Sequence, residues 1–114
     1  LDLIMYDLAE IKEMSGNDQD FIKELIQLFV KNNIEYLHEM NVAYEQKDWV
    51  QVKFFAHKIK PSILVIHAEG LKQPILDLNE YSGKQINLEK IPALLELLNE
   101  QLPVICSELK KEIK

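Results

Sequence analysis

The chain contains few of the residues that break regular structure or cross-link it. Its 114 residues include three glycines, four prolines and one cysteine. Because these residues mark linkers and low-complexity tracts, their scarcity favours a single domain over residues 1–114. The lone Cys106 can form neither an intrachain disulfide nor a Cys-x-x-Cys metal site. Its apolar neighbours predict a buried thiol.

Long apolar runs and an excess of positive charge are also absent. No run approaches the roughly 20 residues of a membrane-spanning helix. Thirteen basic residues against nineteen acidic ones give a net charge of −6, whereas nucleic-acid binding needs a basic face. We therefore expect no nucleic-acid partner, no direct membrane contact and a cytoplasmic domain. The start at Leu1 favours a piece of a longer protein, which could itself be membrane-anchored.

Acidic residues are missing from one continuous segment, Trp49–Ala68. This segment carries Lys53, Lys58 and Lys60 around His57, so its local charge opposes that of the whole chain. A histidine among lysines indicates a group that meets anions, because imidazole is nucleophilic near neutral pH and ammonium groups pair with oxyanions. The strongest candidate anion is a phosphoryl group.

Apolar residues recur at three- and four-residue spacing through nearly the whole chain, which predicts helices and no strands. The expected helices cover residues 4–14, residues 18–46, a segment capped by Asp48, residues 68–81 and a last segment capped by Asn87, with residues 82–84 as a loop. This pattern predicts an all-α fold, an antiparallel four-helix bundle with a short extra N-terminal helix.

The helix that carries His57 has a clear inner face. At about 100° of rotation per residue, an apolar stripe lies opposite the histidine. This stripe consists of Val52, Phe55, Ala56, Ile59, Ile63 and Ile66. His57 should therefore point to solvent or to a partner. Lys53 and Lys60 lie on one flank of it.

The outer face of the same helix is more apolar than a solvated face should be. Beside His57 it carries Val50, Phe54, Lys58, Pro61 and Leu64, which we call the docking patch. Exposed apolar side chains around a polar element are typical of protein-binding surfaces. The alternative is that the N-terminal helix or the edge of the bundle covers some of them.

The residues near His57 suit a carrier of phosphate better than a complete enzyme. Phosphoryl transfer needs mainly positioning and charge stabilisation. The chain offers a nucleophile and cations, but no Gly-rich phosphate loop and no carboxylate cluster near His57 that would hold Mg²⁺. A partner should therefore supply the metal and the catalysis, and we expect no cofactor in this chain.

The segment Ala56-His57-Lys58-Ile59-Lys60-Pro61-Ser62, followed by His67-Ala68 and Leu71, resembles the histidine-containing phosphotransfer (HPt) domains of bacterial phosphorelays. The motif of that family reads Ala-His-x-Leu-Lys-Gly-Ser, then Gly-Ala and a leucine three residues later. Residues 18–36 and Asp48-Trp49 also look like the family's second helix and the start of its histidine helix. The resemblance covers most of the chain, with the specific motif between Ala56 and Leu71.

The resemblance implies that His57 accepts the phosphoryl group and that Lys60 supports it, and the helical spacing adds Lys53 as a further candidate. It also implies docking to response-regulator receiver domains, which hold Mg²⁺ and whose aspartate exchanges the phosphoryl group. The receiver could belong to a hybrid histidine kinase in the same chain. Without a strong dimerising seam, we expect a monomer.

Two positions depart from the family motif. Pro61 stands where glycine is usual, so the fit of a receiver should differ. Its missing N–H also leaves the His57 carbonyl without its helical donor, which could kink the helix. His67 stands where glycine is common, on the side of the helix away from His57 or at its end.

Other readings of the same residues stay open or are weaker. A helical docking adaptor without chemistry at His57 is the main alternative. An independent enzyme with His57 as general base is disfavoured, because a convex helix lacks a pocket and an orienting partner. A zinc site is disfavoured because His38, His57 and His67 have no i, i+3 or i, i+4 relation.

Overall fold

The computed structural model describes residues 5–113, and these residues form helices and no strand. The elements are α1 (Ala9–Met14), α2 (Gln19–Glu45), α3 (Trp49–Val65), α4 (Glu69–Lys84), the 3₁₀ turn η1 (Leu88–Lys90) and α5 (Ile91–Glu112). The sequence-based prediction of an all-α fold is therefore confirmed.

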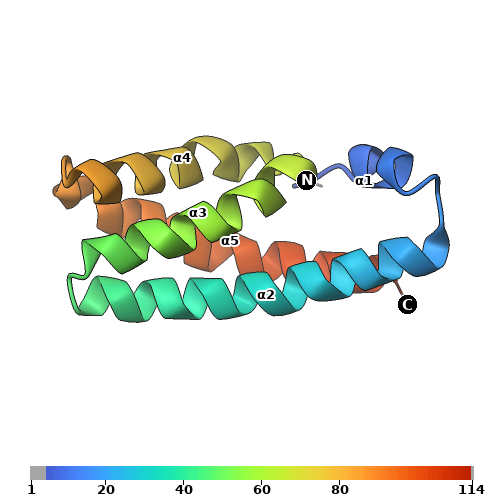
Figure 1. Cartoon of the computed structure of the whole chain (residues 1–114), viewed down its shortest axis with the longest axis horizontal. Helices are drawn as coiled ribbons and strands as arrows, with labels where there is room; N and C mark the ends of the chain where they lie inside the picture. The colour runs from blue at the N-terminus through green and yellow to red at the C-terminus, as the bar shows by residue number, and fades with distance from the viewer. Residues whose placement is uncertain (1–4, 114) are drawn as a thin grey trace.

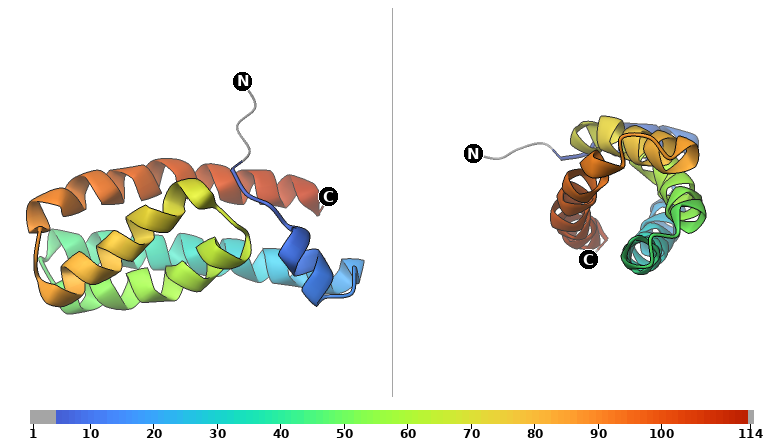
Figure 2. Two further views of the ribbon diagram at one scale, coloured as in Figure 1. Left: turned by 90° about the horizontal axis from the view of Figure 1, so that it is seen from above. Right: turned by 90° about the vertical axis from the view of Figure 1, so that its left-hand side faces the viewer.

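The long helices enclose one apolar core. Helix α2 packs against α3 and α5, and α4 packs against the same two helices. The end-on view in Figure 2 shows these helices around a common centre, and Figure 1 shows α1 beyond the end of α3. Each long helix contributes fully buried aliphatic residues, among them Ile26, Ile59, Ile75 and Leu98. Burial of this aliphatic surface is the main stabilising contribution to the fold.

Aspartate side chains start α2 and α3, as the sequence predicts. The Asp18 carboxylate accepts hydrogen bonds from the amides of Asp20 and Phe21, and the Asp48 carboxylate accepts one from Gln51. These bonds satisfy amides that have no partner within the helix, and a carboxylate also suits the positive end of the helix dipole. The acid-free segment with His57 therefore begins directly after a strong helix start.

The first helix is shorter than predicted, since it begins at Ala9; Ile4 lies outside the described residues. The carboxylate of Asp7 accepts a hydrogen bond from the Ala9 amide at 2.8 Å. The amide of Asp7 donates to the carbonyl of Ile66 at 2.7 Å. The segment before α1 is thus hydrogen-bonded to the end of α3, which prevents this segment from forming a further turn of helix.

Two predictions near the end of α4 were wrong. Residues 82–84 are helical, because the buried Ser82 hydroxyl donates to the Leu78 carbonyl and needs no water. Asn87 provides no side-chain cap to α5. It takes a left-handed conformation (φ 49°) before η1, and α5 begins at Ile91 with Pro92 in its first turn. As a result, Gly83 lies in the last turn of a helix that packs against α3.

Candidate functional site

Helix α3 presents His57 to solvent and buries the opposite face. The inner positions Val52, Ala56, Ile59 and Ile63 are buried, and His57 is exposed. Phe55, at the edge of the predicted stripe, is only partly buried. Within residues 5–113, the imidazole of His57 forms no hydrogen bond and no ion pair. Neither ring nitrogen is therefore engaged by another group of the described residues.

A shallow hollow of about 340 Å³ lies beside the histidine, lined by Val50, Lys53, Phe54 and His57. All four residues belong to α3, and each lies one helical turn from another. The hollow thus has an apolar side, a cation and a nucleophile, and it is open to solvent. It can contact a small anionic group at the surface, but it cannot enclose a substrate.

The three lysines near His57 have different surroundings. Lys53 and Lys60, two helical turns apart, lie on one flank of His57; Lys53 is exposed and Lys60 partly buried. On the other flank, the Nζ atom of Lys58 lies 5.3 Å from the centre of the Phe54 ring, which holds this charge through a cation–π contact. No carboxylate pairs with any of them among the described residues, so no ion pair neutralises their charge.

The docking patch is exposed along its length. Val50 is 71% exposed, Phe54 48% and Leu64 37%. Pro61 and Lys58 are also exposed. None of the apolar members is buried among the described residues, so the alternative that they are hidden is wrong. A phenyl ring with half of its surface in water favours association with an apolar partner surface.

The exposed phenyl ring has a firm support. The ring of Phe54 packs edge-on against Phe55, with the two centres 5.0 Å apart. The centre of the Phe55 ring in turn lies 6.3 Å from the centre of the Tyr36 ring on α2. Such aromatic pairs limit the orientations that each ring can adopt. The Phe54 ring is therefore supported by Phe55, which in turn contacts α2.

The apolar surface continues into a groove that the sequence did not predict. This groove, of about 300 Å³, lies where α1, α2 and α3 meet, and Leu28, Tyr36, Lys58 and Ser62 are among its lining residues. Leu28 recurs at helical spacing with the residues of the core, yet it is 54% exposed. Spacing alone cannot separate a core stripe from a second stripe beside it.

Pro61 is accommodated inside α3, which is helical from Trp49 to Val65. Because proline has no N–H, the carbonyl of His57 lacks the amide donor that normally comes from four residues further on. His57 and Pro61 are both exposed residues, so water has access to this part of the helix. A polar backbone group thus lies beside the nucleophile.

The other two histidines lie elsewhere. His38 is exposed on α2, and His67 lies in the turn between α3 and α4 with a φ of 52°. The Nε2 atom of His67 is 3.0 Å from an oxygen of Glu10, and its Nδ1 atom is 3.8 Å from an oxygen of Glu69. In the described part of the chain, no group of three or more His, Cys, Asp or Glu residues could hold a metal ion.

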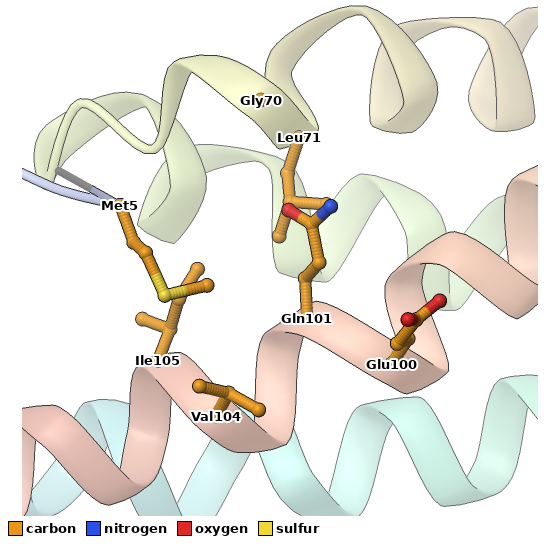
Figure 3. Close-up of a pocket in the computed structure, with 7 residues that line it drawn as sticks. All are labelled: Met5, Gly70, Leu71, Glu100, Gln101, Val104 and Ile105. Carbon is orange, nitrogen blue, oxygen red and sulfur yellow. The ribbon is translucent and has the colours of Figure 1, made fainter. Parts of the chain in front are cut away.

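Another hollow, of about 420 Å³, lies between α4 and α5. Figure 3 shows its lining residues, with Met5 above Ile105 and the side chain of Gln101 reaching towards α4. The hollow has no histidine, lysine or cysteine to act on a substrate. The nearby thiol of Cys106 is buried, and this burial raises its pKa to about 11, which makes it a poor nucleophile. Of the hollows described here, only the one beside His57 combines a histidine with a lysine.

Comparison of the chain with models of known families, with curated proteins and with solved structures gave no significant match. None of the helices between residues 5 and 113 has both the length and the apolar character of a membrane-spanning helix.

Proposed function

We propose that this chain is a phosphotransfer module that accepts a phosphoryl group on His57 and passes it on. The supporting observation is that His57 is exposed and has no polar partner within residues 5–113, with three lysines and no carboxylate along its own helix. In this proposal, helices α2 to α5 form the antiparallel four-helix bundle typical of HPt domains. The bundle would act in the cytoplasm as a monomer.

The chemistry follows from the ring and its neighbours. A neutral imidazole nitrogen attacks the phosphorus atom of an aspartyl phosphate on a receiver domain. An N–P bond forms, the bond between phosphorus and the aspartate oxygen breaks, and the aspartate leaves as a carboxylate. The proton on the other ring nitrogen can pass to water, since the ring is exposed. The reverse sequence returns the phosphoryl group to a receiver.

The lysines have distinct roles in this proposal. Lys60, on the same helix one turn from His57, lowers the energy of the negative charge on the transferring group. Lys53, which shares the hollow with His57, contributes similarly from the preceding turn. Lys58 lies at the rim of the docking patch. The receiver supplies Mg²⁺, whose coordination needs carboxylates that this helix lacks.

The docking patch supports recognition of a protein partner. Because Val50, Phe54 and Leu64 expose apolar surface next to the nucleophile, a receiver that buries them also brings its aspartate to His57. Because the whole patch is already exposed before binding, docking of a partner needs little reorganisation of this chain. Pro61 stands at the point of closest approach, so it should influence which receiver fits.

The test is transfer from a phosphorylated receiver domain to the parent chain and to His57→Gln. The parent should gain a label that is stable in base and labile in acid, and His57→Gln should gain none. His67→Gln is the matched control and should accept label like the parent. Label on His57→Gln, or loss of label from His67→Gln alone, would contradict the assignment of His57.

A docking adaptor is the second candidate. The observation that favours it is Pro61, which occupies the position next to His57 where the HPt motif has glycine. An adaptor would bind receivers through the docking patch and take no label. In that case, Phe54→Ala would weaken receiver binding, whereas His57→Gln would change neither binding nor labelling.

A further inference from the structure

The side chain of Lys53 lies across a glycine of the neighbouring helix. A Cβ atom added to Gly83 of α4 would be 2.9 Å from Cδ, 3.1 Å from Cε and 3.4 Å from Nζ of Lys53. All three close atoms belong to this one side chain. Real Cβ contacts are longer, so the distal half of Lys53 occupies space that any residue other than glycine would fill.

The backbone does not explain why glycine stands at this position. Among the described glycines, only Gly16 has a positive φ, so Gly83 has an ordinary helical conformation that alanine also adopts. Glycine is less favourable than alanine in a helix because it loses more conformational freedom. What Gly83 provides is lateral room for Lys53.

Electrostatics favour the same position. Gly83 lies in the last turn of α4, where carbonyl groups without a helical partner carry partial negative charge. An ammonium group on this turn is attracted to those carbonyls. The aliphatic part of Lys53 meanwhile covers the helix surface, as long basic side chains often do. Lys53 thus has a defined seat on α4.

We infer that Gly83 is a positioning residue, which holds the Lys53 ammonium at the α4 side of the hollow that His57 lines. The inference rests on the proposed function, because it assigns this charge to the phosphoryl group on His57. Lys53 and His57 lie one turn apart and line the same hollow. Free rotation of a lysine would spread its charge over many positions, whereas the seat keeps the charge on one side of the nucleophile.

The test compares Gly83→Ala with Lys53→Met and with the double variant. Gly83→Ala should slow phosphoryl transfer from a phosphorylated receiver by about threefold, as should Lys53→Met. The double variant should be no slower than Lys53→Met, since the glycine acts only through the lysine. Affinity for the unphosphorylated receiver should stay the same, which separates positioning from docking.

Gly70→Ala is the matched control. Gly70 is also a helical glycine of α4, but its added Cβ would meet only the Gln101 Oε1 atom, at 3.4 Å. Both glycine variants should keep or raise the melting temperature. The new methyl group of Gly83→Ala displaces only the flexible end of Lys53, and that of Gly70→Ala meets only the end of Gln101. Only Gly83→Ala should slow transfer. A parental rate for Gly83→Ala, or further slowing of Lys53→Met by it, would overturn the inference.

A structural readout separates this inference from the proposed function. Nuclear Overhauser effects between the Lys53 side-chain methylenes and the Gly83 Hα protons should be present in the unphosphorylated parent. Their absence would overturn the seat even if transfer proceeds. A parent that shows these contacts but takes no label from any receiver would instead overturn the proposed function, and the role of Lys53 in transfer with it.

Discussion

Two histidines, His57 within α3 and His67 in the turn that follows it, have opposite surroundings. His57 lies on the convex face of α3, with lysines on both flanks and no hydrogen-bond partner among residues 5–113. His67 lies in the next turn, with Glu10 at 3.0 Å from one ring nitrogen and Glu69 at 3.8 Å from the other. The hollow beside His67 is also lined by Asp7 and Glu13.

The difference shows that neighbours, not residue type, decide what a histidine can do. Carboxylates repel a phosphoryl group and compete for the ring nitrogens of His67, whereas the surroundings of His57 attract anions. His67 instead joins α1 to the turn between α3 and α4. We propose chemistry at His57 and a structural role for His67, and each proposal can be tested.

The largest effect is expected when His57 receives an acidic neighbour. Lys60→Glu should slow transfer by about tenfold, which corresponds to ~1.4 kcal/mol of lost transition-state stabilisation. Receiver binding should weaken less, because Lys60 lies on the flank away from most of the docking patch. Kinetics of labelling and titration with the unphosphorylated receiver measure the two quantities. Lys72→Glu, on the exposed face of α4, is the control; equal losses in transfer and binding would exclude a role at the phosphoryl group.

A smaller effect is expected from the two positions that depart from the HPt motif. Pro61→Gly should restore an amide donor to the His57 carbonyl and open the approach to the ring, which should raise transfer about threefold. His67→Gly should leave transfer unchanged, since this residue lies away from His57. The same labelling assay compares them. No rise for Pro61→Gly would show that Pro61 does not limit access. A rise for His67→Gly would contradict its separation from the transfer site.

Loss of the contact between α1 and His67 should have a modest effect on stability. Glu10→Gln weakens an exposed pair, so it should lower the free energy of unfolding by less than about 1 kcal/mol. Hydrogen exchange should become faster in residues 9–14 while the amides of α3 keep their protection. Glu13→Gln, in the same helix without this contact, is the control. Uniform loss of protection across the chain would contradict a local role.

The smallest effect at neutral pH comes from the buried thiol of Cys106, which affects stability only in alkaline solution. Burial raises the pKa of Cys106 to about 11, so the folded state keeps the thiol protonated after the unfolded chain begins to ionise near pH 9. The unfolded state then binds fewer protons, and the free energy of unfolding should fall as pH rises through this range. Denaturation at pH 8 and pH 10 measures the slope. Cys106→Ala should show a shallower slope than the parent, and equal slopes would exclude this contribution.

Local patterns predicted much of the structure because helices obey local rules. The apolar stripe from Val52 to Ile66 identified the buried face of α3, and Asp18 and Asp48 cap the predicted helices. The prediction failed at Ser82, which was expected in a loop, and at Asn87, which was expected to cap α5. Ser82 is buried within α4, and Asn87 adopts a left-handed turn. Packing against neighbouring helices, which local pattern does not contain, decided the case of Ser82.

By itself, the sequence determined which side of its helix carries His57 and that lysines without carboxylates surround it. Those properties depend on residues within a few turns, and helical periodicity relates them directly. Only the tertiary structure decided that Lys53 rests on Gly83, that Glu10 reaches His67, and that a groove opens beside Tyr36. Each of these contacts joins segments far apart along the chain, so it forms only when the helices pack around a common core.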